Sequence, residues 1–92
     1  MTDEKMPEMN FEIYIMMISS NVLMYLGKVK NPATGLVECN IPVAKLHIDI
    51  LRMMREKTRG NLSGTEDALL QATIANLEMR YLEAVQADKA NA

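Results

Sequence analysis

The sequence predicts an all-α fold of three helices, with the first helix central and an irregular or hairpin-like connection between the first two. The chain has 92 residues with only three prolines and four glycines, so most of it can form regular structure. Apolar residues recur at spacings of three and four in three segments, and helix start and stop signals bound these segments. We therefore expect a single helical domain over residues 10–86, between flexible tails at 1–9 and 87–92.

The first helix is predicted at residues 10–26. Asn10 suits the N-cap position, because its short side chain can accept a hydrogen bond from a free backbone amide. Gly27 suits the end of the helix, since glycine readily adopts the conformation that stops one. In the connection that follows, Val29 can pair with Leu36–Val37 in a short hairpin, and an irregular loop is the alternative.

The second and third helices are predicted at residues 42–58 and 64–86. Asn40 reads as the cap of the second helix. Ser63 and Glu66 form the S-x-x-E pattern of a capping box, in which each side chain binds a backbone amide of the other residue. The apolar positions expected to face the core are Val43, Ala44, Ile48, Ile50, Leu51 and Met54 in the second helix, and Leu70, Ile74, Leu77, Tyr81 and Val85 in the third.

Composition excludes several classes of protein. The formal net charge of −2 does not favour nucleic acid as a partner. The single cysteine, Cys39, cannot form an internal disulfide, which fits a reducing cytoplasm. The N-terminal residues lack the basic start of a signal peptide. Polar residues Ser19, Ser20 and Asn21 interrupt the longest apolar run, so we expect no membrane span.

Four stretches together resemble a known family: "NPATG" (31–35), "AKLHIDIL" (44–51), "EKTRGNL" (56–62) and "LEMRYLE" (77–83). They resemble short bacterial proteins classed only as a domain of unknown function, number eighteen-forty-four in its naming series. The likeness covers about residues 11–85, and Gly64–Thr65 departs from the family at a turn where acidic residues are usual. The resemblance implies a bacterial, cytoplasmic and mainly helical protein, and it transfers no activity and no functional residue.

His47 and Cys39 are the residues with the most reactive side chains, and neither is expected to act chemically. A zinc site needs three or four converging ligands, whereas the chain has one histidine and one cysteine. Asp49 lies two residues from His47, and side chains at that spacing on a helix do not face each other. We therefore expect no metal site, no cofactor and no catalytic group, with His47 partly buried and hydrogen-bonded.

The segment "TRGNLSGT", residues 58–65, has the glycine and hydroxyl content of a phosphate-binding loop. It lacks the spacing of the phosphate-loop motif and follows no predicted strand. A capped joint between two helices accounts for its residues, so phosphate binding is the weaker alternative. The basic residues near the end of the second helix are interpreted as a solvated face, since cations there suit the helix dipole.

The first helix has two apolar faces when its residues are placed at about 100° intervals. One face holds aromatic and branched residues and should pack on the other two helices. The other is rich in methionine and needs a second chain to cover it. The residues of this predicted oligomer interface are Ile13, Met16, Met17, Ser20, Met24 and Gly27.

Two classes of function therefore stay open. The favoured one is a homo-oligomeric structural or protein-interaction module, most simply a homodimer, because symmetric dimers are the commonest oligomers. An unidentified protein partner also fits the methionine face, because methionine side chains adapt to varied surfaces. The alternative is a small-ligand site or an enzyme site between the helices, which needs polar groups converging in the core.

Overall fold

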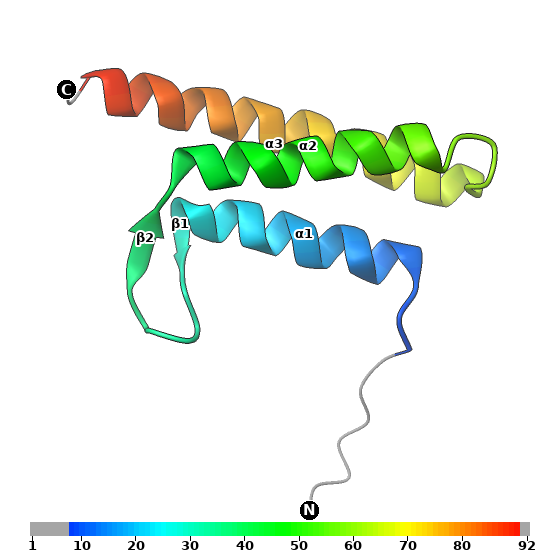
Figure 1. Cartoon of the computed structure of the whole chain (residues 1–92), viewed down its shortest axis with the longest axis horizontal. Coiled ribbons are helices and arrows are strands. Elements are labelled where there is room, and N and C mark those ends of the chain that lie inside the picture. The colour runs from blue at the N-terminus through cyan, green and yellow to red at the C-terminus, as the bar shows by residue number, and fades with distance from the viewer. Residues whose placement is uncertain (1–7, 91–92) are drawn as a thin grey trace, which may run out of the picture.

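The computed structural model describes residues 8–90. Of the tails predicted at 1–9 and 87–92, residues 1–7 and 91–92 therefore lie outside the described residues. Three helices and two short strands follow one another along the chain (Figure 1). Their bounds are α1 Phe11–Tyr25, β1 Leu26–Lys30, β2 Val37–Cys39, α2 Ile41–Lys57 and α3 Gly64–Ala90. α3 thus continues beyond its predicted end at residue 86.

The assignment to the all-α class is wrong, because the chain also contains a two-stranded antiparallel sheet. β1 follows α1 without a loop, and Leu26, which the periodicity placed in the first helix, pairs with Cys39. Gly27 has a φ of +77°, a value that side-chain-bearing residues rarely adopt, and this turns the chain from helix to strand. At the other end of the hairpin Lys30, rather than Val29, pairs with Val37.

Local side-chain hydrogen bonds set the helix starts. The Asn10 carboxamide oxygen accepts from the Ile13 amide at 2.8 Å, and the Asn40 carboxamide oxygen accepts from the Val43 amide at 3.2 Å. The Asn40 amide itself donates to the Tyr25 carbonyl at 2.7 Å. That bond ties the beginning of α2 to the end of α1 and closes the hairpin between them.

The core lies where the three helices meet, and each helix supplies one line of side chains to it. Because each helix contacts the other two, α1 is not central, which is a second correction. A three-helix core needs only one face of each member, so α1 retains an outer side. The buried residues are Ile15, Val22, Leu26, Ala44, Ile48, Leu51, Leu70, Ile74 and Leu77.

The relative directions of the helices follow from the short connections. α1 and α2 run in opposite directions, as do α2 and α3, so α1 and α3 run the same way (Figure 1). None of the three described helices combines the length and apolar character needed to cross a bilayer.

Candidate functional site

The outer side of α1 exposes large apolar side chains to solvent. Met16 is 61% exposed and Met17 52% exposed, while their neighbour Ile15 is buried. Met17 and Met24 lie about 150–170° from the buried line through Ile15 and Val22, given about 100° per residue. An apolar helix face therefore points away from the core of its own chain.

The structure brings together most of the six residues predicted for the oligomer interface. Met16, Met17 and Ser20 are exposed, and Ile13 and Met24 are half-buried on the same helix. Gly27 differs, because it lies in β1 rather than on the helix. We define the outer line of α1 as Ile13, Met16, Met17, Ser20 and Met24.

A second exposed apolar line lies on α2. The sequence pattern does not distinguish it from the core stripe of the same helix. Leu46 is 58% and Met53 49% exposed, with Val43 and Ile50 half-buried beside them. We define these four residues as the outer line of α2. Their spacing of three, four and three is that of a coiled-coil seam. This spacing is the signal that the sequence offers, but the helical periodicity also places Val43 and Ile50 in one stripe with the core residues.

The other side of α2 is charged and meets α3. Asp49 accepts from Lys45 at 2.9 Å and from Arg52 at 3.0 Å. Arg52 also forms an ion pair with Glu78 of α3. The hydrogen bond from Lys45, together with the nearby positive charges of Lys45 and Arg52, lowers the pKa of Asp49 below its usual value.

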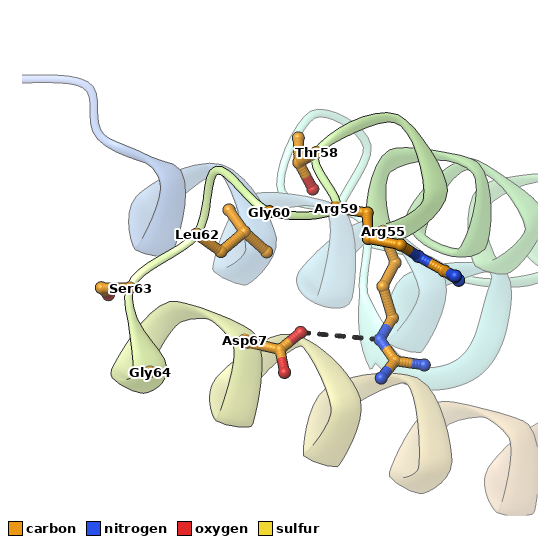
Figure 2. A pocket seen from close by; sticks show the side chains of 8 residues that line it. All are labelled: Arg55, Thr58, Arg59, Gly60, Leu62, Ser63, Gly64 and Asp67. Atoms are coloured by element: carbon orange, nitrogen blue, oxygen red, sulfur yellow. Dashed lines mark ion pairs between the residues drawn. The ribbon is translucent and has the colours of Figure 1, made fainter.

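A cavity of about 320 Å³ lies at the joint between α2 and α3 (Figure 2). Its two arginines both have carboxylate partners, since Arg55 lies 3.6 Å from Asp67 and Arg59 lies 2.6 Å from Glu56. Figure 2 shows the Arg55–Asp67 pair spanning the gap between the two helices. This arrangement links the two helices at the joint by charge pairing.

The capping box predicted at this joint is confirmed. The Ser63 hydroxyl accepts from the Glu66 amide at 3.1 Å, and the Glu66 carboxylate accepts from the Ser63 amide at 2.9 Å. The Asp67 amide donates to the Ser63 carbonyl at 3.0 Å. The Glu66 amide at the start of α3, which could otherwise bind an anion, is therefore already hydrogen-bonded to the chain.

His47 has structural contacts that account for its position. Its Nδ1–H donates to the Val43 carbonyl at 2.9 Å, one turn earlier in α2. Its ring lies against Tyr25 of α1, with ring centroids 5.3 Å apart. His47 thus joins α1 to α2, while Cys39 is an exposed thiol in β2. Within residues 8–90, no three His, Cys, Asp or Glu side chains are grouped as metal ligands.

Comparison with known proteins gives one family. The chain matches no curated protein and no solved structure. A family model does match, and it covers residues 8–83, which include α1, the hairpin, α2 and most of α3. The resemblance seen in the four sequence stretches is confirmed, and the chain belongs to the family described as a domain of unknown function (DUF1844).

Proposed function

We propose that this protein is a small protein-interaction module that forms a homodimer through the outer line of α1 and has no catalytic activity. The observation that carries the proposal is the exposure of two methionines on the outer side of α1. Met17 lies opposite the core, and Met16 lies on its flank, about 110° from the buried line. The proposal places the protein in the cytoplasm, supported by its single cysteine.

Burial of the outer line of α1 supplies a driving force for association. Full burial of a methionine or isoleucine side chain contributes about 1.5–3 kcal/mol relative to leaving it in water. Methionine is flexible and fills irregular gaps, so a face containing Met16, Met17 and Met24 can pack against a copy of itself. A two-fold axis requires such self-complementarity.

The residue order of the outer line suits an antiparallel pair of α1 helices. Ser20 lies near the midpoint of the segment from Ile13 to Gly27, and its side chain is small and exposed. Two copies crossing at Ser20 would allow the helices to approach closely there. Met17 of one copy would then pack near Met24 of the other.

The test is sedimentation equilibrium of the wild type, Met17→Glu and Ser20→Arg at concentrations from about one to about a hundred micromolar. The wild type is expected to be a dimer and both variants monomers, because each places a charge without a partner in a desolvated interface. Circular dichroism of each variant checks that the helices persist. Asn76→Glu, on an exposed position of α3, is the control and should remain dimeric.

A wild-type chain that is monomeric across this range would overturn homodimerisation. The outer line of α1 would then be assigned to a different protein partner. A dimer that survives both Met17→Glu and Ser20→Arg would place the interface elsewhere on the chain.

A further inference from the structure

We infer that the dimer interface is a two-helix face, formed by the outer lines of α1 and α2 together, and that Leu46 packs against Leu46 of the second copy. The inference rests on the proposed homodimer and specifies its surface. The partner is a second copy of this chain, and the interface joins two α1 and two α2 helices in a pair of facing layers.

The outer lines of α1 and α2 lie on the same face of the molecule. The Tyr25–His47 ring contact marks the side on which the two helices meet. On α1, Met17 and Met24 lie about 80–100° beyond Tyr25, measured away from the buried line. On α2, Leu46 lies about 100° beyond His47, also measured away from the buried line of its helix. Both helices therefore continue outward from the ring contact into one apolar surface.

We call this surface the α1–α2 face. It joins the outer line of α2, which is Val43, Leu46, Ile50 and Met53, to the members of the outer line of α1 that lie nearest α2, which are Met17 and Met24. Lys57, in the last turn of α2, continues the outer line one turn after Met53 and places a charge at the end of the face. The other charged residues of α2 lie toward α3, where ion pairs join Arg52 to Glu78 and Arg55 to Asp67. The apolar character of the α1–α2 face therefore suits a second apolar surface rather than a charged partner.

The α1–α2 face comes much closer than the outer line of α1 alone to the area that a stable dimer buries. α1 has 15 residues and α2 has 17, which correspond to lengths of about 22 and 25 Å at about 1.5 Å per residue. A strip about 10 Å wide along one helix projects to only about 220 Å². Two adjacent helices, about 20 Å wide together, project to about 500 Å², before the relief of the side chains adds to the accessible area. Specific interfaces bury about 600–1,000 Å² on each partner.

The register between α1 and α2 brings Leu46 to the two-fold axis. The hydrogen bond from the Asn40 amide to the Tyr25 carbonyl sets these two residues at the same height. Ser20 lies five residues before Tyr25, and Leu46 lies six residues after Asn40. Because the two helices run in opposite directions with the same rise per residue, Ser20 and Leu46 are level to within about one residue. An axis that crosses α1 at Ser20 therefore passes beside Leu46.

The experiment compares two leucines that match in exposure but lie on different faces of the molecule. Leu46 on the α1–α2 face is 58% exposed, and Leu82 on α3 is 59% exposed. In sedimentation equilibrium, Leu46→Glu should raise the dimer dissociation constant at least about a hundredfold, because it opposes two carboxylates across the axis. Leu82→Glu should leave the dissociation constant unchanged.

Chemical cross-linking gives a second readout that does not require the charged variants to fold. In a Cys39→Ser background, Leu46→Cys treated with a short bismaleimide should give a covalent dimer. Leu82→Cys in the same background should stay a single chain on a denaturing gel.

The outcomes separate this inference from the proposed function on which it rests. If Met17→Glu dissociates the dimer but Leu46→Glu does not, and Leu46→Cys fails to cross-link, the two-helix face is overturned and the homodimer stands. If Leu82→Glu dissociates the dimer instead, the interface lies on α3 and the inference is overturned. A monomeric wild type overturns both.

Discussion

At the scale of single residues, Ser63 and Glu66 decide where α3 begins. Each side chain accepts a hydrogen bond from the backbone amide of the other, so two donors at the helix start are satisfied locally. Ser63→Ala removes one acceptor and should lower the free energy of unfolding by about 0.5–2 kcal/mol. Urea unfolding followed by circular dichroism measures this change.

Thr65→Ala, two positions further into the same turn and exposed, is the matched control for the loss of a hydroxyl. It should change the free energy of unfolding by less than about 0.5 kcal/mol. Equal losses in Ser63→Ala and Thr65→Ala would show that the cap does not account for the effect.

The pKa of Asp49 is a measure of the ion pairs on the charged side of α2. Its pKa lies below the usual value, chiefly because Lys45 donates to its carboxylate. A lowered pKa means that the stabilising interaction is present above the pKa of the unfolded chain and is lost as the pH falls through the folded pKa. Lys45→Met should raise the pKa of Asp49, measured by carbon-13 NMR titration of the carboxyl group in the acid range. Lys57→Met is the control and should leave the pKa of Asp49 in place.

At the scale of elements, Gly27 is the point where α1 gives way to β1. A Cβ atom there would lie 3.5 Å from the Glu38 carbonyl oxygen, an ordinary contact, so steric exclusion is not the obstacle. The obstacle is the φ of +77°. Gly27→Ala should therefore cost about 1–2 kcal/mol of stability through backbone strain, measured by urea unfolding.

Gly64→Ala is the matched control for Gly27→Ala. Gly64 begins α3 without a positive φ, and a Cβ atom added there would meet no other atom within 4 Å. Alanine should leave the stability unchanged or raise it slightly, because it restricts the unfolded chain without straining the helix. Destabilisation of similar size at both glycines would contradict the role of φ at Gly27.

The contacts at the joint between α2 and α3 predict that it does not bind phosphate. Arg55 and Arg59 both have carboxylate partners, and the Ser63 hydroxyl already accepts from an amide at the start of α3. Thermal unfolding in the presence of inorganic phosphate, pyrophosphate and nucleotides should therefore show no rise in the melting temperature. A rise that Ser63→Ala abolishes would restore phosphate binding at this joint.

At the scale of the whole molecule, a chain of this length has a small core. Nine buried hydrophobic residues form it, and ten large hydrophobic side chains within residues 8–90 are exposed. If association covers part of that exposed surface, the folded dimer is favoured by mass action. The melting temperature should then rise with chain concentration between about one and a hundred micromolar, and Met17→Glu should remove this dependence. A wild-type melting temperature that does not change with concentration would contradict the dimer.

Much of the fold could be predicted because its signals are local. The asparagine caps and the Ser63–Glu66 box act over three residues, and the helical period places Leu70, Ile74 and Leu77 on one side without knowledge of any neighbour. The methionine face of α1 could be recognised for the same reason. The family could also be recognised, because the stretches that carry the resemblance are contiguous in the sequence.

Local sequence patterns are enough to predict the three helices, their starts and the apolar outer line of α1. Local patterns do not predict that Leu26 begins a strand, since its pairing with Cys39 depends on a contact with a distant part of the chain. The packing of the helices also buries some apolar residues of α2 in the core and leaves the others in an exposed outer line. Periodicity shows that a helix has apolar positions, but which of them become buried depends on where the neighbouring helices pack. For that reason the packing of α1 and α3 against α2, and not the periodicity of α2, leaves Leu46 among the most exposed leucines of the chain.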